Sequence, residues 1–298
     1  MPLPESAPLP RAAVVGARGF IGRALCAKFD TLNVPALPLD RGDLDSPDAV
    51  VRIGECRTIY WAASTINPAI AVDEPERVAV DQAAFSAFLD LLAKLASPPQ
   101  VVLLSSGGTV YGRDIPPFTE DTPARPDTAY GRAKLDLERE LSVRPLPQVI
   151  ARISNAYGPG QRPARGQGVI GYWLSAVAAR RPLRVIGSLD VVRDYLYIDD
   201  LVTALVALHE PDNSPNLLNL ASGVPTTLRE VLATIASVTG VERPKIELVP
   251  QRDFDLDEVW LDATLAYQTL GWKPQTNLAT GIAATWDWVV STNSTSGG

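Results

Sequence analysis

Gly16-Ala-Arg-Gly19-Phe-Ile-Gly22 is the stretch that decides the fold, because it joins a short apolar run at 11–15 to a helical pattern at 20–29. Glycine at these positions allows a tight turn and a close approach of the backbone to a ligand. The free amide groups at the start of the next helix then face the negative charge of a pyrophosphate. The order of strand, glycine turn and helix therefore predicts a dinucleotide-binding site.

Outward from this turn, short β-branched runs alternate with stretches of helical periodicity. Strands are expected at 34–39, 58–62, 101–104 and 149–153, and helices at 78–96 and 130–141. Pro35 and Pro38 restrict the 34–39 strand to the edge of a sheet or to an irregular form. Alternating strands and helices predict an α/β fold with a Rossmann-type, doubly wound parallel sheet.

The pattern changes after Gly158, where a loop rich in Pro, Gly and Arg is followed by short strands and helices in mixed order. A smaller mixed α/β substrate-binding domain is expected there. The expected organisation is a dinucleotide-binding domain at 10–158, to which segments at roughly 183–222 return, a substrate-binding portion at 159–292, and flexible ends at 1–9 and 293–298.

The composition narrows the classes of protein to consider. The chain has 298 residues, a net charge of -7 and no run rich in lysine or arginine, so it offers nucleic acid little attraction. No apolar run reaches the roughly 18 residues of a membrane span, and no signal peptide is evident, so a cytoplasmic protein without a membrane partner is expected. Two cysteines and a lone histidine, His209, suggest no disulfide framework, metal cluster or Ser-His triad.

Tyr130-Gly-Arg-Ala-Lys134 is a second chemical signal. Residues four apart on a helix share one face, so the phenol and the ammonium can converge on one bound molecule. A free tyrosine, with a pKa of about 10, is a poor base near neutrality. A nearby ammonium and an oxidised nicotinamide both favour the phenolate, which suits the pair to proton transfer. The alternative is two unrelated residues on a helix surface.

The order of the motifs resembles that of the extended short-chain dehydrogenase/reductase superfamily, in particular its NAD-dependent epimerase/dehydratase family. The glycine turn comes first, Tyr130 and Lys134 come later, and the resemblance runs over nearly the whole chain. The other segments that carry it are Ser105-Ser-Gly-Gly-Thr-Val-Tyr-Gly112, Arg152-Ile-Ser-Asn-Ala-Tyr-Gly-Pro159, Arg193-Asp-Tyr-Leu-Tyr-Ile-Asp-Asp200, Arg252-Asp-Phe-Asp-Leu256 and Leu270-Gly-Trp-Lys-Pro274.

This resemblance implies roles for several residues. Tyr130 is expected to be the acid/base, and Lys134 is expected to hold the cofactor ribose and assist the tyrosine. Asn155, Arg193 and Arg252 are expected to grip the diphosphate of a nucleotide sugar, because the fixed donors of arginine match phosphate oxygens. An ion pair with the aspartate that follows each arginine is the alternative. The other residues expected to bind the cofactor are Gly16, Arg18, Gly19, Phe20, Ile21, Gly22, Arg41, Asp43, Leu44, Ala62, Ala63 and Ile153.

One position departs from the family pattern. Members usually carry Ser or Thr four residues before the tyrosine of the Val-Tyr-Gly segment, where it hydrogen-bonds the reacting sugar oxygen. This chain has Gly107 there. Ser106 and Thr109 carry the nearest hydroxyl groups, and either is a candidate for the catalytic and substrate-binding role.

The motifs also limit the reaction. Dehydratases of the family carry an Asp-Glu pair where this chain has Gly108 and Thr109, so dehydration is not expected. A 4-ketoreductase and a 4-epimerase remain. Only 45 residues separate Gly16 from Trp61, which leaves little room for the helix and strand that usually follow the second strand in 4-epimerases. In this compression the chain resembles the reductases of the family.

The cofactor preference depends on charges near the second strand. Arg18 and Arg41 can pair with a ribose 2′-phosphate, which favours NADP(H), whereas Asp40 suits the bare 2′-hydroxyl of NAD(H). We expect an NADPH-dependent 4-ketoreductase of an NDP-4-keto-6-deoxyhexose, with NAD(H) as the other option. An NAD-dependent 4-epimerase resembling UDP-glucose 4-epimerase, and a non-catalytic dinucleotide-binding scaffold, are the alternatives. The resemblance further implies a homodimer packed through the helices near 78–96 and 130–142.

Overall fold

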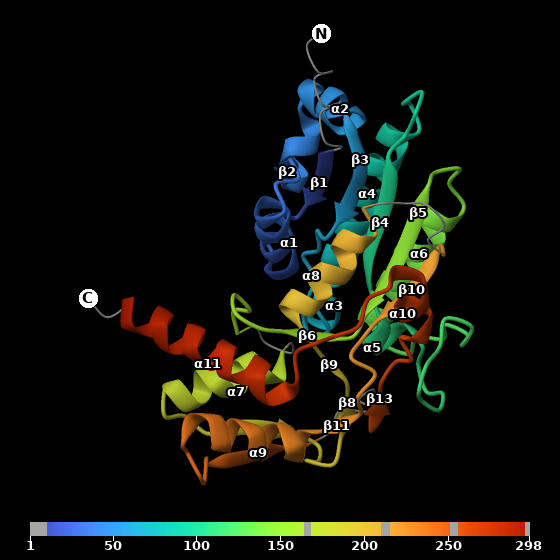
Figure 1. Ribbon diagram of the computed structural model, residues 1–298. Coiled ribbons are helices and arrows are strands. Elements are labelled where there is room, and N and C mark those ends of the chain that lie inside the picture. The colour runs from blue at the N-terminus through green and yellow to red at the C-terminus, as the bar shows by residue number, and fades with distance from the viewer. Residues whose placement is uncertain (1–10, 164–167, 210–214, 251–255, 296–298) are drawn as a thin grey trace.

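A six-stranded parallel sheet forms the centre of the protein (Figure 1). The computed structural model describes residues 11–163, 168–209, 215–250 and 256–295. In sheet order, the strands are β10 (Leu217–Leu220), β5 (Gln148–Ile153), β4 (Gln100–Ser106), β3 (Cys56–Trp61), β1 (Arg11–Val15) and β2 (Ala36–Leu39). Every neighbouring pair is parallel, which confirms the expected doubly wound sheet.

Both faces of this sheet are covered by helices, because alternate residues of a strand point to opposite sides. On one face, Ala12 and Val14 of β1 pack with the apolar sides of two helices. On the other, Ala13 and Val15 pack with two further helices. The first pair of helices is α1 (Phe20–Thr31) and α8 (Ile198–Ala207), and the second is α4 (Glu76–Leu92) and α6 (Ala129–Ser142). The middle of each strand is therefore mainly apolar, although buried polar residues such as Ser105, Arg152 and Asn219 also lie in the sheet.

Strand β2 lies at the edge of the sheet, as the two prolines predict. Pro38 lies within the strand and Pro35 immediately before it, where a missing backbone N–H costs no ladder hydrogen bond. A short 3-10 helix, η1 (Arg41–Asp45), and α2 (Pro47–Gly54) connect β2 to β3. No strand forms between β2 and β3 in this fully traced connection, as the compression read from the sequence predicts, but α2 shows that a helix does fit there.

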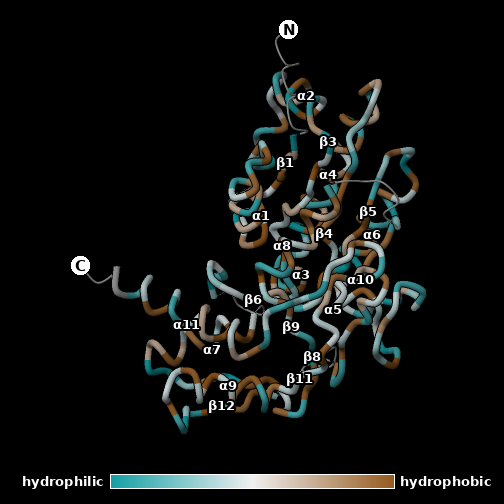
Figure 2. Tube along the Cα trace, viewed as in Figure 1, coloured by the Kyte–Doolittle hydropathy of each residue, from teal (hydrophilic) through white to brown (hydrophobic). Residues whose placement is uncertain are grey.

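The second half of the chain forms a helical group at the carboxyl edge of the sheet (Figure 1). Its main elements are α7 (Val169–Ala178), β7 (Leu183–Ile186), α9 (Leu228–Thr239), β12 (Ile246–Val249) and α11 (Leu278–Thr295). Figure 2 shows hydrophobic stretches along α7 and α9. Trp173 of α7, Ile235 of α9 and Ile282 of α11 belong to the same buried cluster as Val14 of β1. The two halves thus share one core.

Several short elements connect the halves. Strand β10 and helix α8 belong to the main sheet and its cover, although they follow the helical group's first members in sequence. The remaining short elements are α3 (Ile70–Asp73), α5 (Gly107–Val110), β6 (Asn155–Tyr157), β8 (Val192–Arg193), β9 (Tyr195–Tyr197), β11 (Thr226–Thr227), β13 (Glu258–Val259) and α10 (Thr264–Leu270). Strand β6 pairs with β9, and β8 lies between β11 and β13.

The C-terminal helix differs from the sequence-based expectation. We expected a flexible end from residue 293, but α11 continues to Thr295. Val289, which precedes the small and polar residues of this end, is buried in the shared core and anchors the last part of the helix. None of the helices described in the structure is both long and apolar enough to cross a membrane.

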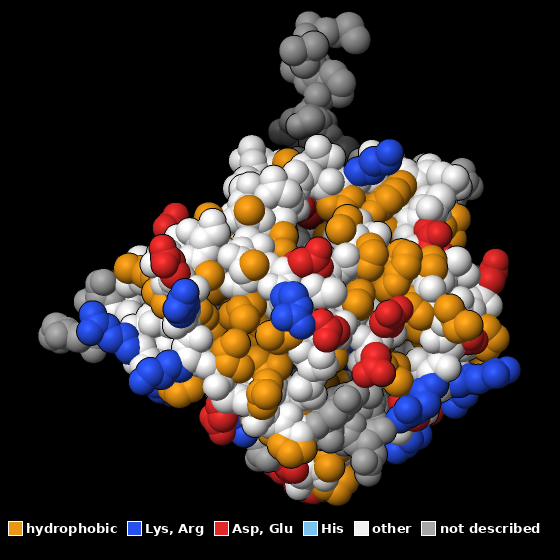
Figure 3. Space-filling view, turned by 90° about the horizontal axis from the view of Figure 1, so that it is seen from below, with side chains coloured by type: hydrophobic (Ala, Val, Ile, Leu, Met, Phe, Trp, Pro, Cys, Tyr) orange, Lys and Arg blue, Asp and Glu red, His pale blue; other side chains and the backbone are white. Residues whose placement is uncertain are grey.

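Hydrophobic side chains on the face seen from below lie in several groups separated by acidic and basic side chains (Figure 3). Strand β12 lies at this end of the molecule beside α9 (Figure 2) and exposes Ile246 and Leu248. Exposed apolar side chains interrupted by charges are normal for a protein surface.

Candidate active site

The glycine turn has a backbone that only glycine fits. Gly16 follows β1 with φ +89°, and a Cβ atom on it would lie 2.7 Å from the Ala63 backbone nitrogen at the end of β3. A Cβ on Gly22 would overlap the Gly16 carbonyl oxygen and lie 2.9 Å from the Gly16 carbonyl carbon. Helix α1 begins after Gly19, and no side chain caps it. Its first amide groups are therefore available to an anion, as the expected pyrophosphate requires.

The segment after β3 is fixed by a carboxylate that the sequence analysis missed. Asp81 of α4 is buried, and it accepts hydrogen bonds from the Thr65 N–H at 2.8 Å and the Ser64 hydroxyl at 2.9 Å. Its other oxygen forms an ion pair with Arg41 at 2.6 Å. These contacts hold the segment that begins at Ala62 beside the glycine turn. Arg41, which we expected to meet a ribose phosphate, thus has a carboxylate partner in the protein.

The end of β2 presents a second carboxylate. Asp40 follows β2 directly and forms an ion pair with Arg18 at 2.6 Å. The Arg18 side chain is 88% exposed, so solvent weakens this pair. Asp43 accepts a hydrogen bond from the Asp40 N–H at 2.7 Å and so stabilises η1, while Leu44 packs on the apolar core. The cofactor roles of Arg18, Asp43 and Leu44 stay predictions.

Tyr130 and Lys134 lie on one face of the first turns of α6. Thr128 caps the helix by accepting a hydrogen bond from the Gly131 N–H at 2.9 Å. The Lys134 Nζ atom lies 5.7 Å from the centre of the Tyr130 ring, and the Lys134 side chain is buried. Tyr130 packs against a small apolar cluster that includes Ala133. The helix therefore brings phenol and ammonium together as the four-residue spacing predicts.

Ser106 and Thr109 lie at the carboxyl end of β4, in the middle of the sheet. The Thr109 hydroxyl donates to the Ser106 Oγ atom at 3.0 Å. Both residues are partly exposed. The backbone of Thr109 also lies against Gly131, where a Cβ would overlap the Thr109 carbonyl oxygen. The backbone of Thr109 is thus adjacent to the first turn of α6, at the residue that follows Tyr130 in sequence.

A buried ionic network lies beneath these residues. Glu138 of α6 forms an ion pair with Arg152 of β5 at 2.7 Å, and it also accepts a hydrogen bond from Ser105 of β4. The Arg152 guanidinium lies 4.7 Å from the centre of the Tyr111 ring. Burial lowers the pKa of Arg152, but the hydrogen bonds and charge of Glu138 outweigh it and raise that pKa. Tyr111 in turn donates to Asn219 of β10 at 2.6 Å. The network ties α6 to three strands of the sheet.

Two of the residues expected to grip a diphosphate, Asn155 and Arg193, lie in the short strands β6 and β8. Ile153 ends β5, and Asn155 in β6 donates to the Asp194 carbonyl at 3.0 Å. Arg193 donates to the Leu256 carbonyl at 2.8 Å, which fastens the C-terminal segment to β8. Arg252 lies outside the described residues. A diphosphate-binding role for Asn155 and Arg193 remains a prediction.

Asp194 is an unusual feature of this region because its carboxyl group is almost completely buried, with an exposed fraction of 1%. Burial raises its pKa from 3.8 to about 7.

The two cysteines are not suited to act as nucleophiles, because burial raises the pKa of both Cys26 and Cys56 to about 11.

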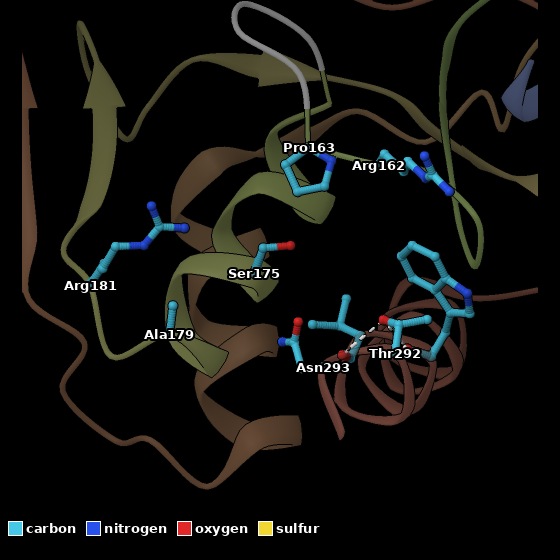
Figure 4. A pocket seen from close by; sticks show the side chains of 9 residues that line it. Arg162, Pro163, Ser175, Ala179, Arg181, Thr292 and Asn293 are labelled. Atoms are coloured by element: carbon cyan, nitrogen blue, oxygen red, sulfur yellow. Dashed lines mark hydrogen bonds between the residues drawn. The ribbon is translucent and has the colours of Figure 1, made fainter. Parts of the chain in front are cut away.

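A pocket of about 550 Å³ lies elsewhere, between α7 and α11 (Figure 4). Arg162, Ser175 and Arg181 line it together with Trp288 and Asn293. None of the residues predicted for the active site belongs to its lining, so it has no part in the chemistry considered below.

Comparisons with known proteins agree with this geometry. Residues 12–221 match the model of the NAD dependent epimerase/dehydratase family. The chain therefore belongs to that family, and it is an enzyme of the extended short-chain dehydrogenase/reductase class, as the resemblance of its motifs indicated.

Individual relatives include both kinds of enzyme that the sequence left open. The chain is 31% identical to UDP-glucose 4-epimerase of Mycolicibacterium smegmatis, over 92% of this chain and 97% of the relative. It is 28% identical to dTDP-4-dehydro-6-deoxyglucose reductase of Escherichia coli, over 90% and 94%. Among solved structures, MoeE5 in complex with UDP-glucose and NAD is similar with a TM-score of 0.86 and 26% identity, over 95% of this chain and 99% of that one.

Three residues of the site were not found from the sequence. Asp81 lies among apolar residues of a helix, and Arg152 among those of a strand. A charged residue in such a position is expected to have a buried partner, but the sequence does not show which residue that is. Glu138 could have been found, because continuing the four-residue spacing from Tyr130 through Lys134 leads to it. Its partner comes from another strand, which the spacing does not reveal.

Proposed function

We propose that this enzyme reduces the 4-keto group of a nucleotide-diphosphate 6-deoxyhexose with a nicotinamide cofactor. The observation that carries the proposal is the pairing of Tyr130 and Lys134 at the start of α6, beside the hydroxyls at the carboxyl end of β4. Ligands of doubly wound sheets bind outside the carboxyl ends of the strands, where these side chains gather. A proton donor next to a cation and hydroxyl donors is what carbonyl reduction requires.

Each residue has a task in this reaction. Tyr130 protonates the ketone oxygen as it becomes an alcohol, and Lys134 stabilises the phenolate that remains and holds the cofactor ribose. Asn155 and Arg193 orient the diphosphate. The nicotinamide, when bound, supplies the hydride. The glycine turn suits the cofactor's pyrophosphate, because the absence of side chains on Gly16 and Gly22 lets the backbone pack closely and α1 begins without a side-chain cap on its amide groups.

We propose NAD(H) as the cofactor and thereby revise the preference for NADP(H) read from the sequence. That preference depended on Arg18 and Arg41 being free to meet a 2′-phosphate. Arg41 is instead paired with the buried Asp81. The exposed Arg18 pairs only weakly with Asp40, so the loss of Arg41 is what removes the support for NADP(H). Asp40, at the end of β2, suits the 2′-hydroxyl of NAD(H) and would repel a phosphate.

A 4-epimerase is the second candidate, supported by the similarity to UDP-glucose 4-epimerase and by the same Asp40. An epimerase retains its cofactor and returns the hydride to the sugar, with Tyr130 acting first as a base. The observation that favours the reductase is that β2 is the outermost strand, with only η1 and α2 between it and β3. The short connection between β2 and β3 leaves less protein over the cofactor than a longer one would, which suits a cofactor that must leave after every turnover.

One experiment separates the candidates. Purified protein is mixed with dTDP-4-keto-6-deoxyglucose and NADH or NADPH, and cofactor absorbance is followed. Steady loss of NADH supports the proposal. Conversion of UDP-glucose to UDP-galactose without net cofactor loss would replace it by the epimerase. Inactivity in both assays, with dinucleotide bound, would point to the scaffold.

We also propose a homodimer packed through α4 and α6. These helices lie side by side, joined by the Arg144–Asp90 ion pair at 2.7 Å and a hydrogen bond from Gln82 to Asp136. Val80 on α4 is 56% exposed. Light scattering gives the mass in solution, and a monomer with full activity would contradict the proposal.

A further inference from the structure

The space where Gly107 would carry a Cβ atom is already filled by the side chain of another residue. Gly107 follows Ser106 at the carboxyl end of β4 and is buried. A Cβ atom on Gly107 would overlap the Leu261 Cδ1 atom and lie 3.2 and 3.3 Å from its Cδ2 and Cγ atoms. A serine or threonine at position 107 therefore requires Leu261 to move.

Leu261 has little freedom to move. Its exposed fraction is 0%, and it packs in a cluster with Tyr111, Phe118 and Val259. The backbone on both sides is fixed: the Phe118 N–H donates to the Trp260 carbonyl at 3.0 Å, and the Phe118 carbonyl accepts from the Asp262 N–H at 2.9 Å. The apolar side chain of Leu261 thus fills the space that the family's usual serine or threonine at position 107 would need.

The nearest hydroxyl pair can take over that task. Thr109 and Ser106 lie 3.0 Å apart, oxygen to oxygen, and both remain partly exposed although their neighbour Gly107 is buried. Thr109 also lies against the acid/base helix, because its carbonyl oxygen fills the space where a Cβ atom on Gly131, the residue after Tyr130, would lie.

We propose that Thr109 donates the hydrogen bond to the reacting sugar oxygen, that Ser106 orients it, and that Leu261 makes this arrangement necessary by closing position 107. Hydroxyl protons rotate freely, so Ser106 can donate to Thr109 while Thr109 donates to the substrate. A chain of hydroxyls polarises its outer donor and strengthens it. This inference rests on the proposed function at C4 of the sugar, whichever direction the reaction takes.

The activity test compares variants that differ by single groups. Thr109→Val keeps the shape and removes the hydroxyl, and it should lower kcat about 10²- to 10³-fold with little change in KM, as expected for loss of one transition-state donor. Thr109→Ser should stay within about threefold of the wild type because it retains the hydroxyl. Ser106→Ala should cost about tenfold, since the outer donor remains. Retention of wild-type kcat by Thr109→Val would overturn the proposal.

The part played by Leu261 has a test that does not depend on turnover. Gly107→Ser should lower Tm, measured by circular dichroism, because the new side chain meets Leu261, and Leu261→Ala should lower it by leaving a cavity. Combining the two should cost less than the sum, since the serine enters the space vacated. Additive losses would show that the two positions do not compete for one space.

A triple variant tests whether a hydroxyl at position 107 can replace that of Thr109. Adding Gly107→Ser and Leu261→Ala to Thr109→Val should restore at least about tenfold of the lost kcat, because the hydroxyl returns to the family's usual position. Failure of the proposed function is recognised separately: wild type inactive on both sugars overturns that function and this inference together. Active wild type, inactive Tyr130→Phe and active Thr109→Val would overturn this inference alone.

Discussion

Replacing Glu138 by glutamine should destabilise the protein strongly, although the change removes only one charge. The side chains of Glu138 and Arg152 are 4% and 6% exposed, so neither charge is solvated by water. Glutamine keeps the volume and one hydrogen bond but leaves the Arg152 guanidinium without a counter-charge. Removing one partner of a buried pair costs about 3–5 kcal/mol. We expect about 3 kcal/mol, the lower end, because some hydrogen bonding to Arg152 and Ser105 can persist.

Asp136→Asn is the matched control, because it removes a carboxylate from the same helix two residues earlier. Asp136 pairs with Arg139 at 3.4 Å, and the two side chains are 48% and 68% exposed. Exposed pairs of this kind contribute about 0–1 kcal/mol. The control therefore separates the effect of burial from the effect of losing a negative charge on α6.

The assay is urea unfolding at pH 7, followed by circular dichroism, with Tm as a second readout. A loss of about 3 kcal/mol corresponds to a fall in Tm of roughly 5 °C in a chain of this size. Changing both partners, Glu138→Leu with Arg152→Met, should recover much of the loss, since apolar replacement of a buried pair is often neutral. The reasoning is refuted if Glu138→Gln costs no more than Asp136→Asn.

Three further predictions concern the cofactor site and the pH dependence of stability. Gly22→Ala should weaken NADH binding at least about tenfold in a fluorescence titration, because its Cβ would overlap the Gly16 carbonyl oxygen, whereas Gly42→Ala, with open space around it, should not; equal affinities would contradict this. Asp40→Asn should lower the preference for NADH over NADPH in initial rates, since a negative charge near the 2′-position is lost; an unchanged ratio would count against NAD(H) selection by Asp40. Asp194 has its folded pKa raised from 3.8 to about 7, so the folded state binds its proton more tightly and stability falls as pH rises from about 4 to 7. Asp194→Asn removes this dependence and should be more stable than wild type at pH 8, by at most about 4 kcal/mol, with a smaller difference at pH 5 in urea unfolding; a difference that does not grow with pH would refute the assignment.

The buried pair that Glu138→Gln would break and the hydroxyl pair of the candidate site meet at the carboxyl end of β4. Ser105 points to the buried pair beneath α6, whereas Ser106 takes part in the hydroxyl pair at the site. Successive residues of one strand therefore serve opposite faces. A change in the buried network should also reach the site, because the same helix carries Glu138 and Tyr130.

Local sequence determined a large part of this protein. The glycine turn between β1 and α1, the edge position of β2 and the shared face of Tyr130 and Lys134 all follow from neighbours along the chain. Glycine sets the backbone of a turn, proline removes a donor, and helical spacing fixes which side chains face the same way. These are short-range effects, so they can be read without knowing what lies opposite.

Contacts between segments far apart in the chain became visible only in the folded structure. No local pattern explains Gly107, because the side chain that excludes a Cβ there is Leu261, brought in by a β-bridge to Phe118. The sequence likewise left Arg41 available to a phosphate, and only the packing of α4 against the sheet brings Asp81 to it. Steric exclusion and charge pairing depend on which atoms come within a few ångströms, and chain distance says little about that. The folded structure therefore shows the contacts of Gly107 and Arg41 on which our proposals for the substrate and the cofactor depend.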